Sequence, residues 1–329
     1  MSHVGYIDPN VIMETRNLKV YFVKGGFLAK KQVTRAVDGV DVKIKKGEVL
    51  ALVGESGSGK TTLGRTMIGL QKITSGQVIY NRDGSPIIID AKSKVPKYIR
   101  RELQMIYQDP YSSIDPYMKV YDALSMPLKY AGFSKKEIQS KIEDSLTMVG
   151  LPLDILPNYV FQLSGGQRQR LNIARAISLD PKFLVADEVV TMLDASLKGE
   201  IVELFKDINR KTGISMLFIT HELPIAKLVA ERMLVMYRGK IVEAGSINAV
   251  LKDPLHPYTK ALIQAYPKIS PETKDVIKRI DVKEAEVAQI ESKGCPFYHR
   301  CPYASERCLQ EMPKLKKVAS DHEVACYLY

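Results

Sequence analysis

Gly54-Glu55-Ser56-Gly57-Ser58-Gly59-Lys60-Thr61-Thr62 is a glycine-rich segment from which the fold of this chain can be predicted. It follows the apolar run at residues 49–53 and precedes residues 63–70, which we predict to be helical. A strand, a glycine-rich loop and a helix in this order are the context that a phosphate-binding loop requires. The alternative interpretation is a glycine-rich turn that resembles a phosphate-binding loop by chance. The flanking strand and helix patterns argue against it. The stretch therefore predicts a nucleoside triphosphate site.

The residue types in this loop suit phosphate binding. Glycines let the backbone wrap closely around a polyphosphate, and successive amide N–H groups at the helix start then face the anion. The Lys60 ammonium can reach the β- and γ-phosphates, and the Thr61 hydroxyl can ligate Mg²⁺. We therefore expect the nucleotide to be bound by Gly54, Ser56, Gly57, Ser58, Gly59, Lys60, Thr61 and Thr62.

Composition indicates a globular protein. The chain has 329 residues, of which 45% are hydrophobic and 26% charged. No segment approaches the roughly 20 apolar residues of a membrane-spanning helix, and the N-terminus lacks the layout of a signal peptide. We expect a soluble, cytosolic protein that reaches a membrane only through a partner.

The net charge of +11 leaves the partner open. A basic surface suits nucleic acid, anionic lipid or acidic proteins, and it also arises from a solvated lysine-rich face. The basic residues are dispersed, and no pattern of interleaved aromatic residues predicts binding of single-stranded nucleic acid.

Strand and helix patterns alternate along most of the chain, which predicts an α/β fold. Beyond residue 252, prolines and then cysteines change the character of the sequence, so we place a domain boundary near residue 253. We predict strands at residues 12–23, 33–44, 49–53, 75–80, 86–90, 183–186, 214–219, 233–237 and 241–244. We predict helices at residues 63–70, 134–149, 164–177, 196–210 and 224–229.

Asp187 and Glu188 follow the apolar run at residues 183–186, which reads as a buried parallel strand. A carboxylate at the carboxyl end of such a strand can hold Mg²⁺, and its neighbour can polarise an attacking water. A helix-start Asp-Glu pair is the alternative interpretation, but the upstream phosphate loop argues against it.

A second anion site is predicted at Ser164-Gly165-Gly166-Gln167, which leads into a helix. These residues, with the phosphate loop and the Asp-Glu strand, resemble the three defining motifs of ABC ATPases. The resemblance implies a P-loop ATPase core with a mixed sheet, an antiparallel β subdomain, a helical subdomain at about 111–180 and a small C-terminal Cys-rich extension. The ATPase domain would span residues 1–253 and the extension residues 254–329.

The same resemblance implies roles for further residues. Gln108 matches the glutamine that contacts Mg²⁺ and the attacking water, and His221 matches the histidine that senses the γ-phosphate. Asp194 matches the loop that crosses the dimer interface. Phe22 is our choice for the aromatic residue stacked on adenine, with Tyr21 as the alternative. Glu188, His221 and Gln108 are thus the expected catalytic residues, and Thr61, Gln108 and Asp187 the expected Mg²⁺ ligands.

In this family two cassettes pack head to tail, so that the signature of one caps the ATP of the other. ATP hydrolysis would then require a dimer. One departure stands out: the family usually has proline and threonine after the acidic pair, where this chain has Val189-Val190-Thr191. Because both acids are present, we still expect hydrolysis.

All four cysteines lie near the C-terminus, with the spacing C-x5-C-x6-C-x17-C: Cys295, Cys301, Cys308 and Cys326. In a cytosolic chain this favours a metal or cluster site, either Zn²⁺ or iron–sulfur. The paired C-x2-C knuckles of zinc ribbons are absent. His256-Pro257-Tyr258-Thr259 and the cysteine tail resemble oligopeptide and dipeptide importer ATPases, which implies a [4Fe–4S] cluster, with Zn²⁺ as the alternative.

The resemblance implies the motor subunit of a di- or oligopeptide importer, at the cytoplasmic face of the membrane. Residues 62–65 and 109–113 look more like the second, F-type ATPase of such systems. The expected partners are a paralogous D-type ATPase in a heterodimer, two permease subunits and an extracytoplasmic substrate-binding protein. The alternatives are an oligosaccharide or nickel importer and a non-transport ABC ATPase acting on nucleic acid. No nucleic-acid partner is expected.

Overall fold

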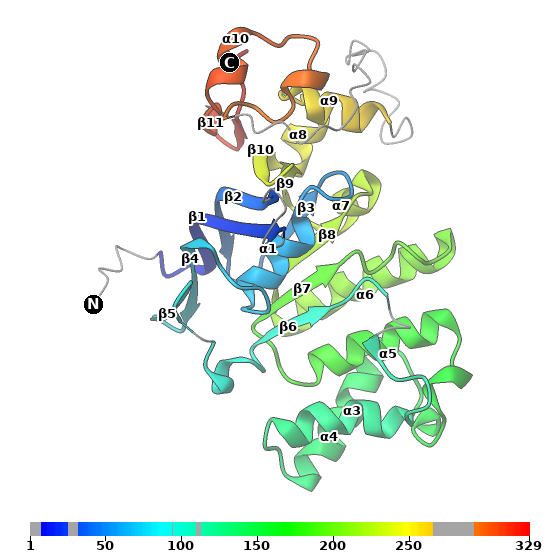
Figure 1. The fold of residues 1–329 in the computed structure, drawn as a ribbon. Coiled ribbons are helices and arrows are strands. Elements are labelled where there is room, and N and C mark those ends of the chain that lie inside the picture. The colour runs from blue at the N-terminus through cyan, green and yellow to red at the C-terminus, as the bar shows by residue number, and fades with distance from the viewer. Residues whose placement is uncertain (1–7, 26–31, 94, 110–112, 266–292) are drawn as a thin grey trace.

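The computed structural model describes residues 8–25, 32–93, 95–109, 113–265 and 293–329. Its centre is an eight-stranded sheet with the strand order β11-β12-β10-β9-β3-β8-β7-β6 (Figure 1). The five strands from β9 to β6 are parallel, and the remaining neighbours are antiparallel. The mixed sheet that the sequence predicts is therefore present. The parallel strands are β3 (Val49–Val53), β6 (Leu103–Ile106), β7 (Phe183–Asp187), β8 (Ser215–Thr220) and β9 (Arg232–Tyr237).

Both faces of the parallel strands are buried, and alternate residues enter different cores. In β8, Leu217 and Ile219 pack with α1 and the antiparallel sheet, whereas Met216 and Phe218 pack toward the opposite side. Successive side chains of a strand point to opposite faces, so one apolar run can serve two cores. The helices against this sheet are α1 (Lys60–Met67), α6 (Ala195–Thr212) and α7 (Leu223–Val229).

A second sheet forms the antiparallel β subdomain, with the order β2-β1-β4-β5. Its long strands β1 and β2 pair with several register shifts, which bend the sheet around α1 (Figure 1). The strands are β1 (Val11–Lys24), β2 (Gln32–Lys45), β4 (Ser75–Arg82) and β5 (Ser85–Asp90).

Three helices, α3 (Val120–Tyr130), α4 (Lys135–Val149) and α5 (Gly165–Ile177), form the helical part at the opposite end from the C-terminus (Figure 1). The predicted start of α4 is confirmed: Ser134 and Glu137 make a reciprocal capping box. Gly150 ends the helix in a left-handed conformation. Residues 111–112, at the predicted start of this subdomain, lie outside the described residues.

The chain beyond the predicted boundary at residue 253 is joined to the central sheet. β12 (His322–Val324) pairs with β10 (Lys240–Ser246), and β11 (Lys316–Ala319) pairs with β12. The fully buried Glu243 of β10 accepts hydrogen bonds from the backbone N–H groups of Leu255 and His256, both at 2.8 Å. Its Oε1 also lies 2.7 Å from Nε2 of His322. The helices of this region are α8 (Ile247–Lys252), α9 (Pro257–Gln264) and α10 (Glu306–Gln310).

Among the described residues, no helix is both long and apolar enough to cross a bilayer.

Candidate functional site

The phosphate loop joins β3 to α1, and two of its glycines are held closely by other backbone. A Cβ on Gly54 would lie 2.2 Å from the carbonyl oxygen of Met236, and one on Gly59 would lie 1.9 Å from that of Ala36. Both glycines also have positive φ, as does Gly57. Larger residues would therefore strain the loop and push it away from its neighbours.

Lys60 begins α1 and folds its side chain back over the loop. Its Nζ donates to the carbonyl oxygens of Gly54 at 2.8 Å and Glu55 at 3.0 Å. Burial lowers the pKa of this lysine, while the nearby carboxylates of Glu188, Asp187 and Glu55 act in the opposite direction. The Lys60 ammonium is thus largely desolvated and, among the described residues, hydrogen-bonded only to backbone carbonyl oxygens, so a bound phosphate would provide it with a charged partner in the loop.

The other loop residues surround the same space. The Ser58 hydroxyl is buried and has no hydrogen-bond partner within the described part of the chain. Ser56 is exposed, and Thr62 is half-buried with its carbonyl oxygen accepting from the Thr66 hydroxyl. A buried hydroxyl without a partner is costly unless a ligand completes it, so Ser58 favours a bound group at this loop.

Thr61 meets Asp187 beside the loop. The Thr61 hydroxyl donates to Asp187 Oδ1 at 3.0 Å, which connects the start of α1 to the end of β7. Burial raises the pKa of Asp187, although the hydrogen bond from Thr61 lowers it. The two side chains offer neighbouring oxygen atoms in a buried setting, a donor set that fits Mg²⁺.

Glu188 is where the predicted catalytic side chains come together. Gln108 Nε2 donates to its Oε2 at 2.9 Å, His221 Nδ1 lies 3.5 Å from its Oε1, and Lys60 Nζ lies 3.8 Å from the same oxygen. Glu188 adopts a positive φ, and its N–H donates to the carbonyl of Ile219 on β8. An uncommon backbone conformation is therefore held by the sheet, which aims the carboxylate at the phosphate loop.

The two valines after Glu188 belong to the core. Val189 and Val190 are 2% and 0% exposed. They belong to the hydrophobic core that also contains the buried side chains of α3, α4 and α5. Backbone hydrogen bonds from Thr191 to Glu188 and from Leu193 to Val190 close two consecutive turns. Asp194 then caps α6 by accepting from the Leu197 N–H at 3.0 Å. The departure from the family pattern is thus accommodated as apolar packing.

The predicted second anion site lies at the start of α5, in the helical part rather than at the phosphate loop (Figure 1). Ser164 is exposed, and its hydroxyl accepts from the Gln167 N–H at 3.3 Å while Gln167 Oε1 accepts from the Ser164 N–H at 2.9 Å. Gly165 is half-buried, and a Cβ on Gly166 would lie 3.2 Å from Leu197. The helix N-terminus is therefore capped but remains open to solvent.

Phe22 and Tyr21, which are neighbours on β1, differ in exposure and in hydrogen bonding. The Phe22 side chain is 38% exposed. The Tyr21 hydroxyl donates to Asp38 Oδ1 at 2.5 Å, and burial together with this bond raises the pKa of Tyr21 to about 12. The Tyr21 side chain is thus engaged with Asp38, whereas the Phe22 ring is partly exposed to solvent.

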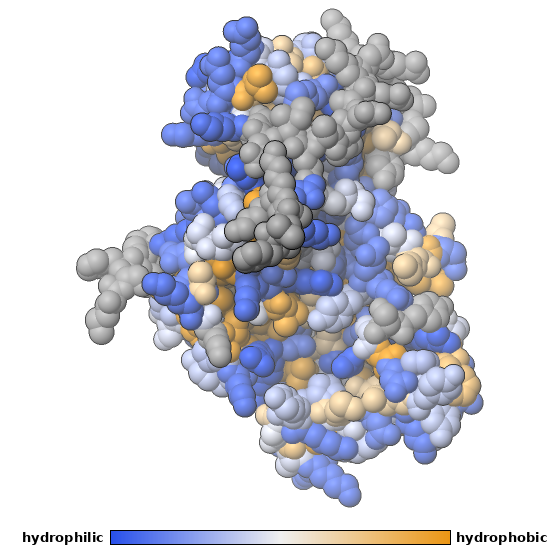
Figure 2. All heavy atoms as spheres, in the orientation of Figure 1, coloured by the Kyte–Doolittle hydropathy of each residue, from blue (hydrophilic) through white to orange (hydrophobic). Residues whose placement is uncertain are grey.

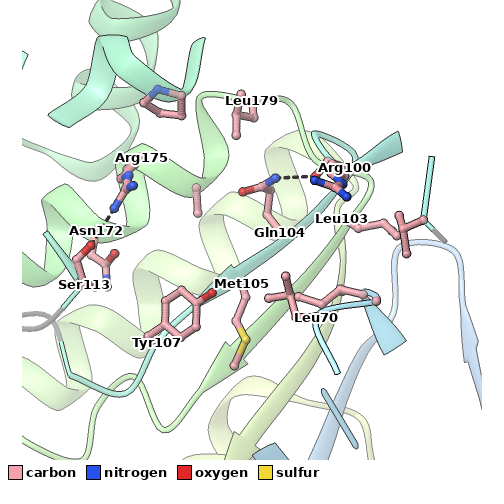
Figure 3. A pocket seen from close by; sticks show the side chains of 15 residues that line it. Leu70, Arg100, Leu103, Gln104, Met105, Tyr107, Ser113, Asn172, Arg175 and Leu179 are labelled. Atoms are coloured by element: carbon pink, nitrogen blue, oxygen red, sulfur yellow. Dashed lines mark hydrogen bonds between the residues drawn. The ribbon is translucent and has the colours of Figure 1, made fainter. Parts of the chain in front are cut away.

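Sequence reasoning missed a cavity of about 490 Å³ between α1, β6 and the helical part (Figure 3). The view in Figure 3 shows Tyr107, Arg100 and Gln104 from β6 and its flanks facing Asn172 and Arg175 from α5. Burial lowers the pKa of Arg175, whose guanidinium donates to the Ser113 carbonyl oxygen at 2.8 Å. Figure 2 shows apolar side chains exposed around α1 and β6.

The four cysteines lie in the C-terminal region, and none of them forms a disulfide bond within the described part of the chain. Burial raises the pKa of Cys295 to about 12, and the Cys295 N–H donates to the carbonyl oxygen of Cys308 at 2.7 Å. Yet among the described residues no group of three or more His, Cys, Asp or Glu side chains is placed to hold a metal ion. The thiols match a cluster in number and chemistry, but their arrangement here does not fit one.

Two contacts to the phosphate loop also escaped the sequence analysis. The Arg300 guanidinium binds the Glu55 carboxylate, with a shortest distance of 2.9 Å, and the Tyr258 hydroxyl accepts from the Glu55 N–H at 2.8 Å. The segments that contain Tyr258 and Arg300 were identified from the sequence only by their resemblance to oligopeptide and dipeptide importer ATPases. No signal in the sequence connected either residue with the loop.

Comparison with known proteins identifies relatives along nearly the whole chain. Residues 37–191 match the ABC transporter family, and residues 242–308 match the C-terminal region of oligopeptide/dipeptide transporters. Oligopeptide transport ATP-binding protein AppF of Bacillus subtilis is 38% identical over 98% of this chain and 98% of its own. Oligopeptide transport ATP-binding protein OppF of Salmonella typhimurium is 37% identical over 96% of each chain.

A solved structure shares the cassette fold. A dimeric, post-hydrolysis ATP-binding cassette bound to ADP and Pi superposes with a TM-score of 0.60 and 26% identity. The match covers 71% of this chain and 98% of that cassette.

Proposed function

Because this chain belongs to the ABC transporter family and carries the C-terminal region of its oligopeptide/dipeptide transporters, we propose that it drives peptide import by hydrolysing ATP. The observation that carries this function is the convergence of Lys60, Gln108 and His221 on Glu188 beside a phosphate loop. Such a cluster serves phosphoryl transfer to water, which relies on positioning and charge neutralisation.

We propose a role for each of the site residues. The amides of the loop and the Lys60 ammonium bind the triphosphate, and Phe22 stacks on the adenine. Glu188 accepts a proton from the attacking water, and Gln108 and His221 orient the carboxylate and the γ-phosphate. Thr61, Asp187 and Gln108 would hold Mg²⁺, which when bound neutralises charge on the β- and γ-phosphates. The Thr61–Asp187 hydrogen bond supports this assignment.

Turnover on this proposal requires two cassettes. Ser164, Gly165, Gly166 and Gln167 form an open helix N-terminus in the helical part, so they can complete an ATP site only from another subunit. We place the Asp194 turn at the same interface, as the family resemblance implies. ATP then belongs to the closed dimer interface, and loss of the γ-phosphate contacts reopens it. We propose a heterodimer with a paralogous D-type ATPase, and the dimeric state of the related cassette is consistent with head-to-tail packing.

Peptide import further requires permease subunits and an extracytoplasmic binding protein. We propose that this chain sits on the permeases at the cytoplasmic face of the membrane. The cavity shown in Figure 3 is suited to receive a permease segment, because Tyr107 lines it and directly precedes Gln108. Arg100 and Arg175 line the cavity, and no carboxylate is among its described lining residues. The docked segment would therefore carry a carboxylate, next to apolar side chains that pack on Ile68, Leu70 and Leu103.

A surface variant tests this docking. Leu70 lines the cavity and is 58% exposed, so Leu70→Asp would repel such a segment with little effect on the fold. We expect peptide-coupled ATP turnover of the complete transporter to fall while the basal turnover of the ATPase pair without permeases is kept. Leu153→Asp is the matched control, because Leu153 is 47% exposed in the helical part and does not line the cavity. An equal loss in both variants would argue against docking at this cavity.

We also propose that Cys295, Cys301, Cys308 and Cys326 bind a [4Fe–4S] cluster, with Zn²⁺ as the alternative. The number of thiols and the family match of the segment that contains Cys295, Cys301 and Cys308 support it, although the arrangement of the thiols here would have to change for ligation. Iron, sulfide and zinc analysis of anaerobically purified protein decides the matter. About four irons per chain support the cluster, zinc alone supports the alternative, and neither metal refutes both.

The cargo is tested by reconstitution. The complex of this chain with its partner ATPase, permeases and binding protein is placed in proteoliposomes, and ATP turnover is measured with di- and oligopeptides, oligosaccharides and nickel as separate cargoes. We expect peptides to stimulate turnover and to be taken up. Stimulation by another cargo would reassign the importer, and stimulation by RNA or DNA without transport would favour the nucleic-acid alternative.

A further inference from the structure

Glu55 of the phosphate loop is bound by the C-terminal region at both its side chain and its backbone. Arg300 Nη1 lies 2.9 Å from Glu55 Oε2 and 3.2 Å from Oε1, and Arg300 Nη2 lies 3.2 Å from Oε1. The Tyr258 hydroxyl accepts from the Glu55 N–H at 2.8 Å. The residues of the ion pair are 245 positions apart in the chain, so the tertiary fold alone creates the contact.

The groups that hold Glu55 stand on a rigid aromatic cluster. Tyr237, Tyr258 and Phe297 are 3%, 1% and 0% exposed, and their rings contact one another with centroids 4.5 to 5.6 Å apart. The Arg300 guanidinium lies over the rings of Phe297 and Tyr237 and also donates to the Tyr237 hydroxyl at 3.3 Å. A guanidinium oriented in this way loses little further entropy when it binds a carboxylate.

The charge of Glu55 affects nucleotide binding. Glu55 places a carboxylate within the loop that must receive a triphosphate, and like charges repel over several ångströms. The hydrogen bond that Arg300 donates to the Glu55 carboxylate raises the pKa of Arg300, so the guanidinium stays charged. The Glu55 carbonyl oxygen accepts from Lys60 Nζ, so the same residue also contacts the principal phosphate-binding cation.

We propose that Arg300 is a positioning residue for ATP binding, because it neutralises Glu55 and holds that carboxylate away from the phosphates. This inference rests on the proposed ATPase function. It gives the C-terminal region a direct part in the nucleotide site. Tyr258 assists by fixing the Glu55 N–H, and thereby the first turn of the phosphate loop.

The test measures nucleotide affinity of the full chain with a fluorescent ATP analogue, together with KM and kcat of the assembled ATPase. Arg300→Ala and Arg300→Gln remove the charge, and we expect the affinity for ATP to fall about three- to tenfold with kcat within about twofold. The loss should be smaller for ADP than for ATP, and smaller at high salt. Arg300→Lys should recover part of the affinity because it restores the charge without the bidentate geometry.

The double variant Arg300→Ala with Glu55→Gln separates neutralisation from general damage. If the unpaired Glu55 carboxylate causes the loss, removing its charge should restore ATP affinity to near the wild-type value. Arg307→Ala is the matched control, since Arg307 lies in the same region and stacks on Tyr327, with 4.1 Å to the ring centroid. It should leave ATP affinity unchanged.

Two outcomes would overturn the inference. One is wild-type ATP affinity in both Arg300→Ala and Arg300→Gln. The other is a loss that Glu55→Gln fails to reverse, or that is equal for ATP and ADP, since either indicates a merely structural role. If instead the proposed ATPase function is wrong, the wild-type chain itself will not bind ATP, so the two failures can be distinguished.

Discussion

Gln108 and Glu188 are hydrogen-bonded across 2.9 Å although 80 positions separate them in the sequence. Gln108 follows the end of β6 and Glu188 follows the end of β7, and the two strands are parallel neighbours. The carboxyl ends of parallel strands meet at one edge of the sheet, so the two side chains face the same space beside the phosphate loop. This geometry connects a residue next to the proposed permease cavity with the proposed catalytic base.

The first prediction concerns that base. Glu188→Gln keeps the size of the side chain but removes its ability to accept a proton, so ATP turnover should fall by at least about a hundredfold. ATP binding should persist, since Lys60 and the loop amides are unchanged. Size-exclusion chromatography of the ATPase pair with ATP and Mg²⁺ should then show a trapped dimer. Turnover near the wild-type rate would remove Glu188 from the proposed role.

The second prediction tests whether Ser164 acts on ATP or only caps α5. Ser134 provides a matched control, because both serines are exposed and both make a reciprocal capping box. Ser164→Ala and Ser134→Ala should each cost about 1 kcal/mol of stability. Only Ser164→Ala should lower the turnover of the assembled dimer, and neither should weaken ATP binding to the isolated chain. Equal turnover in the two variants would contradict the shared ATP site.

The third prediction concerns adenine. Phe22→Ala should weaken ATP binding about tenfold, since an aromatic ring stacked on a base contributes about 1–3 kcal/mol. Val23→Ala is the control, because Val23 is the next residue of β1 and is 60% exposed. The measurement is the affinity for ATP and for inorganic triphosphate. A loss that is the same for triphosphate would show that Phe22 does not contact the base.

The sequence predicted the elements whose pattern is local. The phosphate loop with its flanking strand and helix, the buried runs of β7 and β8 and the capped start of α4 are each visible within a short window, and all are present. β6 was missed because it has only four residues, and β11 was missed because all its residues are exposed and show no alternation.

Which distant residues meet could not be read from the sequence without the resemblance to a family. The contact of Gln108 with Glu188 depends on the order of strands in the sheet, and that order does not follow the order in the chain. The pairing of Arg300 with Glu55 depends on how the C-terminal region folds back over β9 and the loop. A single charged residue has no local sequence pattern from which its partner can be predicted.

The last prediction is a pH dependence at Asp38, whose carboxylate accepts from Tyr21 at 2.5 Å and pairs with Lys240 at 2.8 Å. Burial raises the pKa of Asp38, but the hydrogen bonds from Lys240 and Tyr21 outweigh it, so the pKa lies below its usual value. A carboxyl with a lowered folded-state pKa stabilises the protein above its unfolded pKa and loses that effect as pH falls through the folded one. Asp38→Asn should therefore cost about 1 kcal/mol in urea unfolding at pH 7. The difference from wild type should shrink below about pH 4, and a difference that is constant from pH 7 to pH 3.5 would show that the charge of Asp38 does not stabilise the fold.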